Sequence, residues 1–136
     1  MKLSDENIKE IAEELQMSMV CYIHKETHKI VRIPIENGFV DWKFWQDDLD
    51  KVEKDILSYQ KIEPMPSFQS FQIMEDFANT EVPQKEQIQL LSALERRKPF
   101  RNFNALIHDS DYRQLWFDYR MKRYMDWVRE ELEWEF

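Results

Sequence analysis

Glycine is nearly absent from this chain: Gly38 is the only one among 136 residues. Loops that bind phosphates or dinucleotides need several glycines, because their backbone amides must approach the ligand without an intervening side chain. The sequence therefore excludes P-loop and Rossmann-type nucleotide binding, and we expect no cofactor. Cysteine is equally scarce, since Cys21 stands alone. One cysteine can form neither an intramolecular disulfide nor a cysteine-based zinc site.

Long apolar runs and a basic surplus are also missing. No segment approaches the length that spans a membrane, and the N-terminus lacks the apolar run of a signal peptide. We therefore expect a soluble cytoplasmic protein without membrane contact. The formal net charge of -8 repels phosphate backbones at long range and favours solubility or a basic partner. It weighs against general nucleic-acid binding but leaves room for a local basic patch.

The chain does have enough apolar residues to form the core of one domain. Hydrophobic residues make up 43% and aromatic residues 14% of the sequence, which suits a core of large rings. We predict a single α+β domain over residues 1–136, in which about five to six helices pack a small antiparallel β-sheet and the C-terminal half is all helical. The predicted elements are a helix from Asp5 capped by Ser4, a β-hairpin of strands 19–25 and 29–35, a third strand within 58–64, and helices starting near Ser67, Pro83, Pro99 and Asp109 or Ser110.

The segment that follows Asn37-Gly38 permits two structures. An Asn-Gly pair is typical of a hairpin turn, which would make residues 39–44 a further strand. Against this, five apolar residues recur at steps of three and four, as on one face of a helix. We favour a turn at Asn37-Gly38 and a helix from about Asp41, although the sequence leaves both open. The five residues are Trp42, Trp45, Leu49, Val52 and Ile56.

Two groups near the predicted hairpin could carry chemistry. His24 and His28 flank its turn with Glu26 between them, a set that could bind zinc if further ligands converged. Zinc sites need three or four preorganised ligands, so we predict solvated turn residues and no metal. A nucleophilic cysteine needs a base and electropositive surroundings, and for Cys21 we predict a small buried apolar residue instead.

Carboxylates cluster twice without forming an acid–base pair. Glu75 and Asp76 are adjacent on a predicted helix, and five more carboxylates lie between Trp45 and Asp55. Adjacent residues of a helix point about 100° apart, so these groups do not face one another as general acid and base. We predict solvated faces or a docking surface for a basic partner, and no catalytic residues.

The last predicted helix combines two aromatic stripes with arginines. Arginines among aromatic rings are typical of proteins that stack single-stranded bases. A helix apolar on two sides is also typical of a central packing element whose arginine stems lie over rings. We favour packing and predict that Trp116 and Phe117 are both largely buried. One stripe is Phe117, Met121, Tyr124, Val128 and Leu132, the other is Tyr112, Trp116, Tyr119 and Trp127, and the arginines are Arg113, Arg120, Arg123 and Arg129.

The densest basic stretch is ERRKPFRNF, residues 95–103. Cations suit the carbonyl end of a preceding helix, and Pro99 can start the next helix after displacing Lys98 from the helical conformation. We predict a helix–helix corner here, because strong backbone binding usually rests on roughly 6–10 phosphate contacts. If the chain binds a ligand through cations, the candidate surface is Arg97, Lys98, Arg101, Arg113 and Arg120.

The stretch KPFRNFNALIHDSDYRQLWFDYR, with MEDF upstream and the CYIHKETHKIVRI hairpin before it, resembles a bacterial family, the uncharacterised protein family numbered 0158. The most specific parts are residues 98–100 with Phe103, the pair Trp116-Phe117, and residues 74–77. The resemblance runs over nearly the whole chain. It implies a bacterial cytoplasmic protein of one domain, and it implies no catalytic or cofactor residues.

Three classes of function stay open. We favour a non-enzymatic protein-interaction or regulatory module, which best fits the missing glycines, the single cysteine and the lack of any nucleophile–base spacing. The first alternative is a local nucleic-acid binder that uses the cations from Arg96 to Arg101 and the last helix. The second is an enzyme or small-ligand binder with a pocket between hairpin and helices. The sequence names no partner and no oligomeric state.

Overall fold

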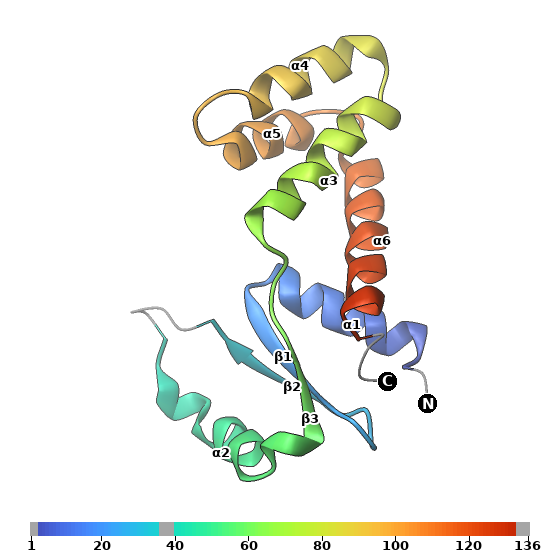
Figure 1. Cartoon of the computed structure of the whole chain (residues 1–136). Coiled ribbons are helices and arrows are strands. Elements are labelled where there is room, and N and C mark those ends of the chain that lie inside the picture. Colours follow the sequence, from blue (N-terminus) through green and yellow to red (C-terminus); the bar gives the residue numbers. More distant parts are fainter. Residues whose placement is uncertain (1–2, 36–39, 133–136) are drawn as a thin grey trace. The chain divides into compact units, whose positions relative to one another are not determined.

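The computed structural model describes residues 3–35 and 40–132. The chain divides into two compact units. We call Met1–Pro64 with Tyr124–Phe136 the sheet unit, and Met65–Arg123 the helical unit. The predicted α+β class is confirmed: one three-stranded antiparallel sheet and six α-helices are described, and the chain is helical from residue 67 onward apart from its connections (Figure 1).

The sheet unit contains the predicted hairpin and third strand. Its strands follow the order β2-β1-β3, with β1 paired antiparallel to both neighbours. In chain order its elements are α1 (Asp5–Gln16), β1 (Met19–His24), β2 (Ile30–Pro34), the short 3-10 helix η1 (Trp42–Phe44), α2 (Gln46–Lys54), the 3-10 helix η2 (Ile56–Ser58), β3 (Tyr59–Ile62) and the end of α6 (Arg113–Leu132).

Helix α1 covers one face of the sheet. It begins where predicted, because the Ser4 hydroxyl accepts a hydrogen bond from the amide of Asn7 at 3.1 Å. On β1, Cys21 is fully buried and lies opposite Arg32 of β2. The Arg32 guanidinium donates to the Glu14 carboxylate of α1 at 2.9 Å, which places this face of the strands beneath α1.

Helix α2 covers the opposite face. Val52 of α2 packs with Val31 and Ile33 of β2 in a buried cluster. Side chains alternate along a strand, so Val31 and Ile33 point away from the face that carries Arg32. Partly buried rings and an aliphatic residue surround the cluster: Tyr22, Trp42, Leu49 and Tyr59. The sheet is therefore the middle layer of the sheet unit.

The helical alternative for the segment after Gly38 is confirmed where the structure describes it. Residues 42–44 form η1 rather than a strand, and α2 follows. Asp41 caps η1 through a 3.1 Å hydrogen bond from the amide of Lys43 to its carboxylate. The predicted turn at Asn37-Gly38 lies outside the described residues.

The helical unit consists of α3 (Ser67–Thr80), α4 (Gln84–Leu94), α5 (Pro99–His108) and the first part of α6. Two predicted caps differ. Pro66, not Ser67, occupies the cap position of α3. Ser110 shapes the α5–α6 connection, where its hydroxyl donates to the carbonyl of Ile107 and accepts from the amide of Tyr112, and α6 starts after this turn.

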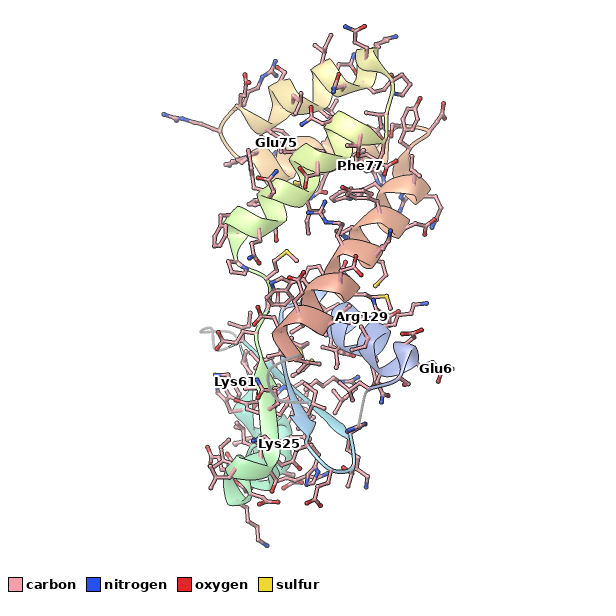
Figure 2. The ribbon with its side chains drawn as sticks, turned by 45° about the vertical axis from the view of Figure 1, so that its right-hand side comes forward. Glu6, Lys25, Lys61, Glu75, Phe77 and Arg129 are labelled. Carbon is pink, nitrogen blue, oxygen red and sulfur yellow. The ribbon has the colours of Figure 1, made fainter. Side chains whose placement is uncertain are left out.

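An aromatic core holds the helical unit together. Phe77 of α3 and Phe103 of α5 are fully buried against Trp116 of α6. Figure 2 labels Phe77 and Glu75 on different sides of α3, as expected for two residues about 200° apart on a helix. Within the MEDF motif, Phe77 is therefore fully buried, whereas Glu75 on another side of the helix is half-buried.

Candidate functional site

Trp116 and Phe117 have different environments on α6. Trp116 is only 1% exposed, whereas Phe117 is 38% exposed. The prediction that both rings are largely buried is therefore right for Trp116 and wrong for Phe117. Neighbouring residues of a helix point about 100° apart, so a helix that directs position 116 into a core turns position 117 to its rim.

The Trp116 ring is a core element. Its centroid lies 5.1 Å from that of Phe77 and 4.9 Å from that of Phe103, and both contacts are edge-to-face. Such pairs contribute about 0.5–1.5 kcal/mol each beyond the burial of their area. Trp116 therefore holds α6 against α3 and α5 and offers no surface to a ligand.

The Phe117 ring lies between two guanidinium groups. The Arg113 guanidinium carbon is 5.4 Å from the ring centroid, and that of Arg120 is 5.6 Å from it. Arg120 also lies 5.7 Å from the Trp116 ring, which connects the exposed ring to the core. We call Arg113, Phe117 and Arg120 the α6 arginine–phenylalanine face. Among residues 3–35 and 40–132, it is the one place where predicted binding cations lie over an exposed aromatic ring.

The other two arginines of α6 are structural. Arg123 donates to the Asp76 carboxylate at 2.9 Å and to the Tyr119 hydroxyl at 2.7 Å, so it ties α6 to α3 within the helical unit. Arg129, within the sheet unit, donates to Asp5 of α1 at 2.9 Å. Asp76 of the MEDF motif is thus an ion-pair partner rather than a solvated carboxylate.

The remaining candidate cations form a separate group at the α4–α5 corner. Arg97, Lys98 and Arg101 are exposed, and their side chains make no ion pair with any residue in 3–35 or 40–132. Lys98 adopts a left-handed conformation (φ 58°, ψ 55°), and the Asn102 amide donates to the Arg97 carbonyl at 2.8 Å. Lys98 therefore makes the predicted turn by a left-handed kink, which keeps it out of the helical region that Pro99 disfavours.

The two groups of candidate cations are not one surface. The corner precedes the first turn of α5, whereas α6 starts beyond its last turn (Figure 1). A ten-residue helix separates its ends by about 15 Å. The structure therefore brings Arg113 and Arg120 together on Phe117 and leaves Arg97, Lys98 and Arg101 at the other end of α5.

The two histidines considered for zinc binding, His24 and His28, lie at the hairpin turn. The His24 Nδ1 atom accepts hydrogen bonds at 3.1 Å from the amides of Glu26 and Thr27, so it holds the hairpin turn. His28 occupies a left-handed turn position (φ 61°). Within the described part of the chain, no three or more His, Cys, Asp or Glu side chains gather as a metal site would require.

Cys21 is the buried apolar residue that the sequence predicts. Its side chain is fully buried between α1 and the sheet. Burial, with Glu14 and Glu10 adding to it, raises the pKa of the thiol from 9.0 to about 12. A thiol with this pKa stays protonated near neutral pH, and the thiolate is the nucleophilic form.

Charge is distributed unequally between the two units. Residues 65–123 contain nine Lys or Arg and eight Asp or Glu, whereas the rest of the chain contains ten and nineteen. The net charge of -8 is therefore a property of the sheet unit. The helical unit is close to neutral, and the argument from net charge against anionic ligands does not apply to it.

The sequence matches the model of an uncharacterised protein family, UPF0158, over residues 7–135. The chain belongs to UPF0158. The match covers nearly the whole chain and confirms the resemblance seen in the KPF, MEDF and Trp116-Phe117 motifs. No curated protein and no solved structure is significantly similar to this UPF0158 chain. Among the described helices, none is both long and apolar enough to cross a membrane.

Proposed function

We propose that this UPF0158 protein is a non-enzymatic interaction module whose α6 arginine–phenylalanine face binds an acidic segment of a partner protein. One observation carries the proposal: the exposed Phe117 ring lies between the guanidinium groups of Arg113 and Arg120. An apolar anchor with two cations beside it fits a segment that combines carboxylates with an apolar side chain. A bacterial cytoplasmic setting belongs to this proposal and is supported by the family resemblance.

Arg113 supports the proposal because its charge is not used inside the described structure. It is exposed, and besides its cation–π contact with Phe117 its side chain makes no hydrogen bond or ion pair with the residues in 3–35 and 40–132. Arg123 and Arg129 show the contrast, since each is bound to a carboxylate. A guanidinium that lies over a ring keeps its N–H donors available for a carboxylate, which it can bind through two parallel hydrogen bonds.

The residue types also favour protein recognition. Arginine and aromatic residues are enriched among the side chains that dominate binding energy at interfaces. The ring holds both guanidinium groups near their bound positions, so less side-chain entropy is lost when a partner binds. Cation–π contacts contribute about 0.5–1 kcal/mol at exposed sites, which is enough to favour the conformations in which the two arginine side chains lie over the ring.

The test compares two variants that lose equal charge. Arg113→Gln/Arg120→Gln removes both cations of the face, and Arg97→Gln/Arg101→Gln removes two cations of the corner. The probe is a fluorescent peptide of alternating Glu and Leu, measured by anisotropy in low salt, with a Lys/Leu peptide as the opposite-charge control. We expect the acidic peptide to bind the parent, to lose at least about tenfold in affinity with the face variant, and to be little affected by the corner variant.

Other results overturn the proposal. Equal losses of affinity with both variants would mean that the peptide binds by non-specific charge attraction. If the acidic peptide does not bind the folded parent at all, the proposed function is wrong. A single-stranded RNA probe completes the comparison, because stacking arginines and rings can also hold bases. If RNA binds at physiological salt and the corner variant abolishes that binding, the module is a nucleic-acid binder.

A further inference from the structure

The three-stranded sheet has two outer strands, β2 and β3. The outer edge of a strand presents backbone N–H and C=O groups that can pair with a strand of another chain, and soluble proteins close such edges in a few recurrent ways. The pairing of each outer strand with β1 decides which of its backbone groups reach the edge.

Two residues of β3 direct their backbone groups away from β1. The Lys25 amide donates to the Ser58 carbonyl at 2.8 Å, one position before β3 begins. Hydrogen-bonded and non-hydrogen-bonded pairs alternate along an antiparallel ladder, so every second residue after Ser58 bonds to β1. The N–H and C=O groups of Tyr59 and Lys61 therefore face the outer edge.

Two of these four outward groups are already used within the chain. The Tyr59 amide donates to the Ile56 carbonyl in η2. The Lys61 carbonyl accepts a hydrogen bond from the side-chain amide of Gln60 at 3.1 Å. Two residues of neighbouring antiparallel strands pair by exchanging both of their N–H···O=C bonds. Neither Tyr59 nor Lys61 has both groups available for such an exchange.

Side chains and prolines add to the closure of the β3 edge. Lys61, labelled in Figure 2, is exposed, and its ammonium group lies 3.0 Å from the Glu63 carboxylate. A lysine on an outer strand opposes pairing, because its charge would be brought against another chain. Pro64 and Pro66 follow β3 and have no amide donors, so the edge stays short.

The β2 edge is interrupted by a proline. The Ile35 amide donates to the Ser18 carbonyl at 3.1 Å, so by the same alternation Pro34 faces the outer edge. Proline lacks an N–H group and is tolerated in a sheet at such outward positions. Arg32, two residues earlier, is bonded beneath α1 to Glu14, and an inward charge of this kind also disfavours pairing at an edge.

We propose that the Gln60 side chain closes the β3 edge against the β3 strand of a second copy of this chain. Of the two outward residues, Lys61 is the one whose amide has no hydrogen bond with residues 3–35 and 40–132, so pairing of identical strands centres on it. In a two-fold antiparallel pair, each Lys61 amide donates to the Lys61 carbonyl of the other copy. Gln60 occupies this carbonyl in both copies, so the exchange is blocked. The inference does not depend on the proposed function.

The test first removes the charge of Lys61 and then varies Gln60 in that background. Lys61→Thr removes the ammonium group and keeps the backbone amide. Gln60→Met/Lys61→Thr also removes the donor that caps the carbonyl, with a side chain of similar length. Gln89→Met/Lys61→Thr adds the same methionine to the exposed surface of α4 as a control. Sedimentation velocity of the full chain at several concentrations gives the dissociation constant of self-association, and circular dichroism checks the fold.

We expect Gln60→Met/Lys61→Thr to associate with a dissociation constant at least about tenfold lower than that of Lys61→Thr or of the Gln89 control. Amide hydrogen exchange measured by NMR locates the contact. Exchange at residue 61 should slow as the concentration rises, because this amide becomes bonded to the other copy. Gln60→Met/Lys61→Pro has no amide at this position, so it should associate as weakly as Lys61→Thr.

Three results overturn the proposal. Association of Gln60→Met/Lys61→Thr that is no stronger than that of Lys61→Thr would mean that Gln60 does not close the edge. An equal gain in the Gln89 control would mean general apolar attraction. Unchanged exchange at residue 61 in the associated protein would place the contact elsewhere. If the proline variant does not fold, the comparison of the two methionine variants still decides.

Discussion

Arginine has different roles in the two units. In the sheet unit, Arg32 and Arg129 are each bound to a carboxylate at 2.9 Å. In the helical unit, Arg123 is bound in the same way, but Arg97, Arg101 and Arg113 have no ion pair within the described residues. The sheet unit has a large acidic surplus and the helical unit has none. A cation is therefore readily paired in the acidic unit and available to a partner in the neutral one.

The comparison shows how a net charge can mislead. The value of -8 opposes anionic ligands only if the charge is spread over the molecule. Most of the carboxylates lie in the sheet unit, and charges separated by more than about 8–10 Å are largely screened at physiological salt. Local pairing around a cation decides its availability, and the predictions below test this for particular residues.

We expect the largest effect on stability from substitutions that compare a core residue of the helical unit with a surface residue. Trp116→Ala should lower the free energy of unfolding by about 3–5 kcal/mol, because a buried ring that contacts Phe77 and Phe103 leaves a cavity. Phe117→Ala should cost less than about 1.5 kcal/mol, since it loses one partly exposed ring with its cation contacts. Denaturant unfolding followed by circular dichroism measures both values.

Hydrogen exchange locates the same effect. Trp116→Ala should raise amide exchange most within residues 65–123, where the ring packs. Equal costs for the two substitutions would place Phe117 in a core and contradict the arginine–phenylalanine face. An unchanged melting temperature for Trp116→Ala would contradict the aromatic core itself.

The next effect contrasts a paired with an unpaired arginine. Arg32→Met should cost about 1.5–3 kcal/mol, because it leaves the buried Glu14 carboxylate without its charged donor. The double variant Glu14→Gln/Arg32→Met should cost less than the sum of the two single variants. Arg113→Met in the helical unit should change stability by less than about 0.5 kcal/mol. Urea unfolding at one pH measures all four, and a large loss for Arg113→Met would show that it is structural.

Alkaline pH should weaken the sheet unit through Cys21. Burial raises the pKa of its thiol from 9.0 to about 12. Below pH 9 the thiol is neutral in both states and contributes no pH dependence. Between pH 9 and 12 the unfolded chain loses the proton while the folded chain keeps it, so the free energy of unfolding falls by about 1.4 kcal/mol per pH unit.

The matched control for this effect is Cys21→Ala, which lacks the thiol but shares every other titrating group. Urea unfolding at pH 8 and pH 10 should show a smaller loss for Cys21→Ala than for the parent. Parallel losses in both proteins would mean that the thiol ionises equally in the folded and unfolded chains. A thiol reagent at pH 8 should also react with Cys21 only when the chain unfolds.

Local patterns predicted the fold well where one physical cause dominated. The β-branched and aromatic residues around Cys21 predicted a strand, and the spacing from Trp42 to Ile56 predicted a helix rather than a further strand. The predicted stripe was too long by one member, because α2 ends at Lys54 and Ile56 lies exposed in η2. The cap of α1 followed from the hydroxyl of Ser4. The boundary between the two compact units falls between Arg123 and Tyr124, inside α6. The apolar spacing of the helix continues across this boundary, so no local sequence pattern could show it.

The candidate site was only partly predictable. Arg113 and Arg120 were chosen for their position among rings, and both lie near the Phe117 ring. Phe117 was assigned to the core because its stripe continues into residues that are buried. Which of two stripes meets solvent depends on tertiary packing. The near-neutral charge of residues 65–123 could not be found from the sequence alone, because this range ends within the last helix and the residues after it add five carboxylates and one arginine.

The smallest expected effect concerns the two left-handed positions that end or start a helix. Ser18 follows α1 in the sheet unit (φ 63°), and Lys98 precedes α5 in the helical unit (φ 58°). A non-glycine residue in this conformation costs about 1–2 kcal/mol, and glycine avoids the cost while adding entropy to the unfolded chain. Ser18→Gly and Lys98→Gly should therefore each stabilise the protein by less than about 1 kcal/mol. Thermal unfolding measures the shift in melting temperature.

Lys98 needs its own control, because its replacement also removes a charge. Lys98→Ala removes the same charge and keeps the strained backbone, so it should not share the gain of Lys98→Gly. If both variants gain equally, repulsion among Arg97, Lys98 and Arg101 limits stability and the conformation of residue 98 does not. If Lys98→Gly loses stability, the side chain holds the corner, and the view of ERRKPFRNF as a turn made by its backbone is wrong. A gain for glycine alone, with binding of the acidic peptide unchanged, would show that the conformation of residue 98 limits stability and that the corner is a structural element.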